Sequence, residues 1–194
     1  MFDIATPDQF YEMVVEDFDE YMAETHSARR AFHCAISAYH LREWVWGGWL
    51  AQDVPIQKAL GIHDKQSFNE WVNRSCVWFK IIRSLVNGAK HFAQDSNGAY
   101  SETMLVIAAP LAFDQPTAGS DDVTWAGPIR YVQGSLPVGL QGKGYLLIDL
   151  GEGASEHRWL PAAYLLEVVV RFWRDFFRRF HPRLDLPISK YHVD

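Results

Sequence analysis

Cysteine is scarce in this chain, which has Cys34 and Cys76 as its two examples among 194 residues. They lie 42 positions apart in apolar, helix-like surroundings, so they form neither a disulfide framework nor a cysteine-based metal motif. Two buried free thiols are simplest to reconcile with the reducing cytoplasm. We therefore expect a cytoplasmic protein without disulfide bonds.

Long apolar runs and a basic excess are also missing. No stretch approaches the ~20 apolar residues that a membrane-spanning helix needs. The acidic start, MFDIATPDQFYEMVVEDFDEYM, lacks the basic region of a signal peptide. The 18 Lys and Arg are outnumbered by 24 Asp and Glu, which gives a net charge of −6. We expect no membrane partner and no broad nucleic-acid binding, although a local basic patch is compatible with this balance.

Apolar and aromatic residues are plentiful, at 48% and 14% of the chain, with eight Trp. That content is sufficient for the core of one domain of ordinary size. We expect a single domain over residues 1–194, with a helical bundle formed by 7–92 and 160–181. A β element of about residues 100–158 is inserted between these two parts.

Helix signals divide the chain. Thr6 has the character of an N-cap before a helix that runs to about residue 24, and Ser27 opens a second helix that ends at Gly47-Gly48. A short helical turn follows at 55–61. The S-x-x-E form of a capping box at Ser67 opens a third helix, which is expected to continue to about residue 92. Pro161 opens the last helix, which ends near residue 180.

Strand signals appear between the third and last helices. TMLVIAAPLAF and YLLIDL are the clearest strands, with VTW and IRYVQ as weaker ones, and Gly, Pro and Asp mark turns between them. The predicted fold is mainly α, of the α+β class. It is a bundle of about four long helices with a small antiparallel β-sheet or hairpin inserted before the C-terminal helix.

The sequence IIRSLVNGAKHF separates polar from apolar residues on opposite sides of its helix. Arg83, Asn87, Lys90 and His91 share one stripe with Lys80. A solvated helix face is one interpretation of this stripe. The other is a site, because the helix dipole favours a cationic imidazole at the C-terminal end, and Asn87 is placed to fix the tautomer of His91.

Three histidines are spaced by sevens on the second helix, at His26, His33 and His40. They share a stripe with Ser37 and Trp44, and apolar residues flank it on both sides, so we expect it to point inward. Successive histidines lie ~10.5 Å apart along the axis, too far for two of them to bind one metal ion. We expect no metal site. Core hydrogen bonds and an approach to the polar stripe of the third helix remain open as roles.

A resemblance connects these two helices. SAYHLREWVW on the second helix and IIRSLVNGAKHF on the next long one resemble a group of small, uncharacterised bacterial and phage proteins. Their pattern is Tyr-His-Leu-Arg-Glu-Trp followed by Asn-x-x-Lys-His, which adds His40 and Arg42 as supporting residues. The segment YLLIDLGEGASEHRWLPAAYLLEVVVRFWRDFF also resembles that group, so the likeness extends over most of residues 36–177.

More distantly, the bundle resembles HEPN domains, which are helical proteins often found in toxin and phage-defence systems, many of them metal-independent ribonucleases. The resemblance implies that Arg83 stabilises the charged transition state and that His91 acts as general acid or base. The family motif places its His closer to the Arg. In this chain seven residues separate Arg83 from His91, which is ~12 Å along the helix axis.

Cofactor motifs are not found. GLQGKG is similar to a phosphate-binding loop, but Pro137 stands where that motif needs its first Gly, and a strand follows instead of a helix. We therefore expect a hairpin turn at this point and no cofactor.

The last helix interleaves arginines with aromatic residues, a composition that also occurs in RNA-binding and membrane-surface helices. Glu167 and Asp175 lie four residues before and after Arg171, which favours an ion-paired solvent face over a core-facing aromatic stripe. The best candidate for a basic patch is the set Arg178, Arg179, His181 and Arg183.

Two hypotheses follow. The first is a HEPN-like bundle that binds or acts on RNA in a defence or toxin–antitoxin setting, through the polar stripe of the third helix. The second is a non-enzymatic bundle that binds a protein partner or a second copy of itself. Its interface would be an exposed cluster of Trp44, Trp46 and Trp49.

Overall fold

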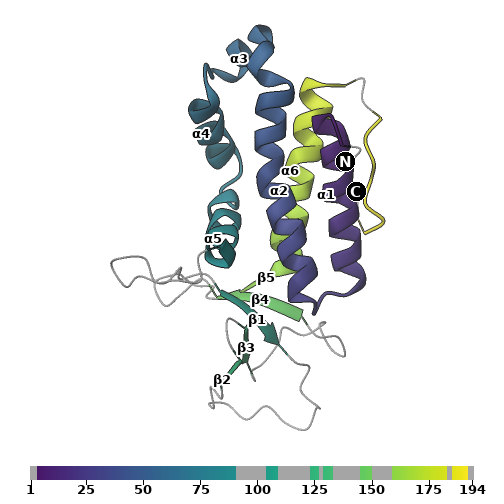
Figure 1. The fold of residues 1–194 in the computed structure, drawn as a ribbon, viewed down its shortest axis with the longest axis vertical. Helices are drawn as coiled ribbons and strands as arrows, with labels where there is room; N and C mark the ends of the chain where they lie inside the picture. Colours follow the sequence, from purple (N-terminus) through teal and green to yellow (C-terminus); the bar gives the residue numbers. More distant parts are fainter. Residues whose placement is uncertain are drawn as a thin grey trace, which may run out of the picture.

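The computed structural model describes residues 4–90, 104–108, 123–126, 129–132, 145–149, 159–182 and 185–191. The helices form a bundle, and the strands form a sheet at one end of it (Figure 1). In chain order the elements are α1 (Pro7–Ala23), α2 (Ala28–Gly48), the 3-10 turn η1 (Leu50–Gln52), α3 (Val54–Leu60), α4 (Lys65–Ser75), α5 (Phe79–Lys90), β1 (Met104–Ala108), β2 (Val123–Ala126), β3 (Ile129–Val132), β4 (Tyr145–Asp149), β5 (Trp159–Pro161) and α6 (Ala162–Phe180). The predicted class, a helical bundle with a small sheet inserted before the last helix, is confirmed.

The first two helices begin where their capping residues predict. The Thr6 hydroxyl accepts from the Gln9 backbone N–H, and the Ser27 hydroxyl accepts from that of Arg30. Each bond satisfies one of the backbone donors that a helix start leaves unpaired. Helix α2 packs against α1, α5 and α6, so it occupies the middle of the bundle (Figure 1). The indole N–H of Trp173 on α6 donates to the backbone carbonyl of Ala38 at 2.9 Å.

The third long helix predicted from Ser67 to about residue 92 is wrong in two respects. Asp64 caps the helix, so α4 begins at Lys65, and Ser67 supplies the return bond of the capping box. The helix then ends at Ser75, because Cys76 is extended at φ −138° and ψ 99°, and α5 starts anew at Phe79.

Weak local preference accounts for the break between α4 and α5. Asn73, Ser75, Cys76 and Val77 all belong to the weaker helix formers, and no Gly or Pro marks the position. The buried residues Phe68 and Val72 of α4 and Phe79 and Ile82 of α5 nevertheless keep one helical spacing across it. Periodicity alone therefore predicts one helix where there are two.

The described strands form one sheet in the order β2-β3-β1-β4-β5. Strand β4 pairs antiparallel with both β1 and β5, and β2 pairs antiparallel with β3. The β1–β3 pair is parallel, with Val106 opposite Arg130. The strand β3, and not β2, lies beside β1, and β2 runs antiparallel to β3 on its other side.

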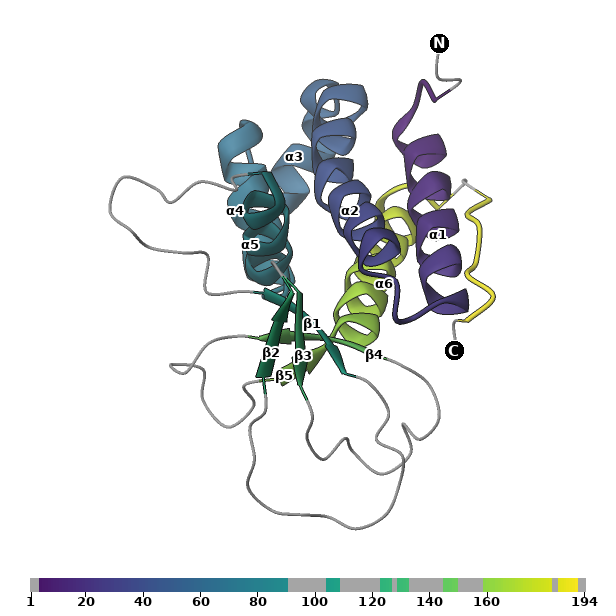
Figure 2. The same cartoon turned by 60° about the horizontal axis from the view of Figure 1, so that its bottom comes forward.

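The sheet joins the bundle through β4 and the start of α6 (Figure 2). Leu146 and Ile148 are buried in the same core as the helices, and the Leu146 backbone N–H donates to the carbonyl of Thr25 at 3.3 Å. The largest fully buried side chains include Trp173, Tyr11 and Phe79. Among the described helices, none combines the length and the apolar character that a membrane crossing requires.

Candidate functional site

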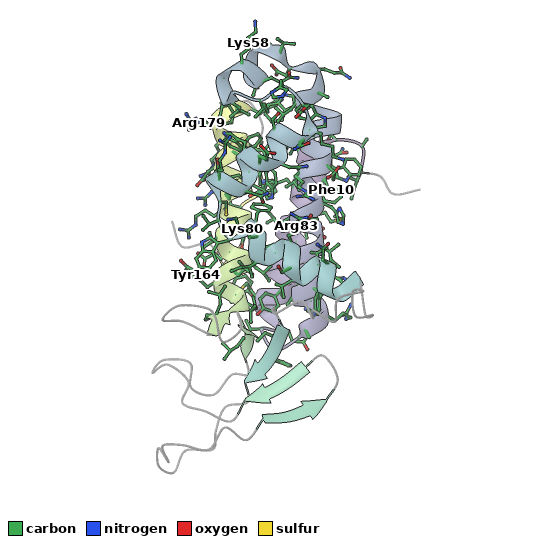
Figure 3. The ribbon with its side chains drawn as sticks, turned by 90° about the vertical axis from the view of Figure 1, so that its left-hand side faces the viewer. Phe10, Lys58, Lys80, Arg83, Tyr164 and Arg179 are labelled. Atoms are coloured by element: carbon green, nitrogen blue, oxygen red, sulfur yellow. The ribbon has the colours of Figure 1, made fainter. Side chains whose placement is uncertain are left out.

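The polar stripe of α5 lies on the outside of the bundle. Lys80, Arg83 and Asn87 are exposed, whereas Ile82 and Leu85 on the opposite side are buried. Figure 3 looks onto this side, with Lys80 and Arg83 on the face of α5 that is turned to the viewer. The arrangement matches the solvated-face interpretation for these three residues.

The other half of the predicted constellation is not described. The side chain of Lys90 and the whole of His91 lie outside the described residues. The convergence of Arg83 with His91 therefore stays a prediction.

The charge of this face is of one sign. Helix α5 contains Lys80, Arg83 and Lys90 but no Asp or Glu, and no acidic residue occurs anywhere between positions 71 and 94. No carboxylate of its own helix can therefore neutralise Arg83. Within a chain of net charge −6, α5 is a local reversal of sign.

The histidine stripe of α2 points outward, contrary to the prediction. His33 and His40 are exposed, and Ser37, between them, is buried at 9% exposure. Helix α1 covers the Ser37 side of α2, while Ala35 faces Leu85 of α5 across a small gap. The histidines lie between these two contacts, where both side chains are exposed.

His40 and Arg42, predicted as supporting residues, are held on α2 itself. The guanidinium carbon of Arg42 lies 3.7 Å from the centroid of the Tyr39 ring, and its Nε lies 3.6 Å from the carboxylate of Glu43. The His40 ring meets Tyr39 edge-on, with centroids 5.5 Å apart. These contacts engage both side chains with their own neighbours in the chain.

The tryptophans predicted to form an interface instead pack against other helices of the bundle. Trp44, Trp46 and Trp49 are half-buried and pack against the core, instead of forming an exposed cluster. Trp44 stacks on Phe10 of α1 at 4.9 Å between centroids, which joins α1 to α2. Trp46 stacks on Phe68 of α4, and Trp49 stacks on Phe177 of α6, each at 6.0 Å. The three rings therefore contact three different helices.

The basic patch predicted at the end of α6 lies only partly within the described residues. Arg171 pairs with Glu167 at 2.6 Å, as the four-residue spacing predicts. Asp175 pairs at 3.0 Å with the adjacent Arg174, which is buried and was not predicted as its partner. The His181 ring meets Trp49 edge-on at 5.0 Å. Arg178 and Arg179 are exposed, and Arg183 lies outside the described residues.

Sequence reasoning missed an aromatic pair beside α5 in which Trp78 is partly buried and Tyr164 is exposed. Trp78 immediately precedes α5, and its ring meets that of Tyr164 on α6 edge-on, with centroids 5.6 Å apart. Tyr164 is 48% exposed, and the neighbouring Val77 is 61% exposed.

A partly buried polar contact joins α1 to α2. The Ser37 hydroxyl donates to Oδ2 of Asp17 at 2.5 Å. Burial raises the pKa of Asp17 above 3.8, and the bond from Ser37 and the nearby His33 act in the opposite direction. Burial also raises the pKa values of the Cys34 and Cys76 thiols, which keeps both protonated at neutral pH and unsuited to nucleophilic chemistry.

In the ranges that the structure covers, no group of three His, Cys, Asp or Glu side chains is placed to hold a metal ion. No protein-family model, curated protein or solved structure matches this chain.

Proposed function

We propose that this protein binds RNA through the exposed polar face of α5. The observation that carries the proposal is the row of Lys80, Arg83 and Asn87, all exposed on a helix without any acidic residue. Lys and Arg contact phosphate oxygens, and an Asn amide both donates to and accepts from base edges or the ribose hydroxyl. The row spans ~10.5 Å along the helix.

The charge distribution supports the same face. Helix α1 lies on the opposite side of the bundle and carries exposed Glu12, Glu16 and Glu20 (Figure 1). An anionic strand is repelled from α1 and attracted to α5, so association is directed to one side of the molecule. Broad coating of the protein by RNA is disfavoured by the net charge of −6.

Binding measured as a function of salt tests the proposal. Each of Lys80→Ala and Arg83→Ala is expected to lower the slope of log K against log salt by about 1, because each removes one phosphate contact. Lys58→Ala, an exposed cation of the short helix α3, is the matched control and is expected to leave the slope unchanged. Wild-type protein that binds no RNA at low salt, or equal slopes for all variants, would contradict the proposal.

RNA cleavage is a second step that the same face would support. In the HEPN-like mechanism Arg83 stabilises the transition state and His91 transfers the proton, without a metal ion. Cleavage in EDTA that both Arg83→Ala and His91→Ala abolish is the expected result for such an enzyme. Binding without cleavage would leave an RNA-binding protein of the bundle class.

Protein association is the alternative function, and the exposed Val77 and Tyr164 favour it. Exposed apolar residues in one place are common at interfaces between proteins. A concentration-dependent sedimentation coefficient that Tyr164→Ser abolishes would support a homo-oligomer, and a monomer at all concentrations would not.

A further inference from the structure

The aromatic pair formed by Trp78 and Tyr164 has a fixed geometry and an open surface. The two rings meet at 88° with their centroids 5.6 Å apart, so the edge-to-face contact orients Tyr164. Nearly half of Tyr164 nevertheless remains accessible, at 48%. A braced ring with an open surface can receive another flat π-system at small entropic cost.

Cations lie on the same side of the bundle as Tyr164 (Figure 3). Lys80 follows Trp78 by two residues, and Arg83 lies about one helical turn further along α5. Figure 3 shows Lys80, Arg83 and Tyr164 on one side of the molecule. Glu167, about one turn beyond Tyr164 on α6, is engaged by Arg171 at 2.6 Å, so its charge is offset locally.

We infer that the ligand of this face is single-stranded RNA, with a base stacked on the aromatic pair and the adjoining phosphates held by Lys80 and Arg83. The inference rests on the proposed function and names its substrate class. Stacking on aromatic side chains needs an unpaired base with a free face, as single strands and loops offer. A duplex has its base faces covered, so it can use the cations but not the aromatic pair.

The combination of charge and flat apolar surface distinguishes this ligand from a second copy of the chain. The acidic face of α1 offers carboxylates such as Glu12 and Glu16, but its apolar residues Phe10 and Val14 are buried in the bundle. The acidic face of α1 in a second copy would pair with Lys80 and Arg83 but would have no apolar surface to cover Tyr164. A nucleotide carries an anion and an aromatic ring together, which matches both parts of the face.

Three variants of the full chain test the aromatic pair. Tyr164→Leu keeps an apolar side chain and removes the ring, Tyr164→Phe keeps the ring, and Tyr191→Leu changes another exposed tyrosine, 42% accessible in the C-terminal segment. The probes are a short oligoadenylate strand and an RNA duplex of the same length. Tyr164→Leu is expected to weaken single-strand binding about tenfold with no change in salt slope. Tyr164→Phe and Tyr191→Leu are expected to bind as the wild type does.

Each other outcome has a definite meaning. Equal affinity of the wild type for single strand and duplex, unchanged by Tyr164→Leu, overturns the stacking surface and leaves RNA binding by α5 in place. A folded wild type that binds neither probe overturns both the inference and the proposed function. Loss of self-association in Tyr164→Leu, with RNA binding unchanged, assigns the pair to a protein interface and also overturns the inference.

Discussion

Helices α1 and α5 contribute apolar faces to the same core and carry opposite charges on their outer faces. Helix α1 contains six acidic residues and no Lys or Arg, whereas α5 contains three Lys and Arg and no acidic residue. They lie at opposite sides of the bundle, with α2 between them (Figure 1). A net charge is thus a poor guide to the surface of this molecule, because it sums two faces of opposite sign.

The two faces also differ in how their charges are used. On α1, Asp17 accepts a bond from Ser37, and Asp19 accepts from the Ser189 hydroxyl at 2.5 Å and from the Lys190 backbone N–H at 3.2 Å. These carboxylates fasten α2 and the C-terminal segment to α1. Lys80 and Arg83 of α5 lie exposed, so their charges are available to a ligand.

Reversing the charge of α5 makes its outer face acidic, as that of α1 is, and has the largest expected effect on RNA binding. The double substitution Lys80→Glu with Arg83→Glu is expected to weaken RNA binding by about a hundredfold or more at low salt, because two attractive charges become repulsive. Both positions are exposed, so the helical circular dichroism is expected to persist. Lys58→Glu, which reverses one exposed charge on α3, is the control. Undiminished binding by the double variant would place the RNA site elsewhere.

Removing the Ser37 hydroxyl tests the structural use of an acidic group on α1. Ser37→Ala leaves the half-buried Asp17 carboxylate without this donor, so we expect the free energy of unfolding at neutral pH to fall by about 2 kcal/mol. Urea denaturation measures the change, and Ser75→Ala, at the exposed end of α4, is the matched control. A loss no greater than that of the control would mean that the bond contributes little.

The pH dependence of stability gives a smaller and more specific signal. Because burial raises the pKa of Asp17, the folded protein retains this proton to a higher pH than the unfolded chain does. The stability that Asp17 contributes is complete below pH 3.8, which is the ordinary pKa of an aspartate. It declines as pH rises through the raised pKa of the folded state. Asp17→Asn is therefore expected to flatten this decline between mildly acidic and neutral pH, which unfolding at several pH values will measure. Glu16→Gln, an exposed neighbour, removes one charge and is expected to keep the wild-type slope.

Local signals predicted much of the fold. The caps at Thr6 and Ser27 and the last helix were predicted correctly, because side-chain capping and proline stereochemistry act within a few residues. The insertion of strands before α6 was confirmed for the same reason, since turn residues and apolar runs are local features.

Sequence reasoning failed where the answer depends on neighbouring helices. Periodicity shows that His33 and His40 share a stripe, but not that α1 and α5 leave that stripe uncovered. It shows that Trp44, Trp46 and Trp49 are close in sequence, but not that each ring enters a different packing contact. The spacing correctly placed Arg83 and Asn87 on one stripe, and the structure shows both exposed, which a solvated face and a surface site both require.

The break between α4 and α5 also separates the two helices as units of local unfolding. A continuous helix transmits fraying from turn to turn, whereas an extended residue at Cys76 interrupts the ladder of backbone hydrogen bonds. Helix α5 can therefore open and close while α4 keeps its own bonds, as a separate unit of local unfolding. The amides of α4 and α5 then report different opening free energies in hydrogen exchange. A ligand held by Lys80 and Arg83 would slow exchange in α5 first.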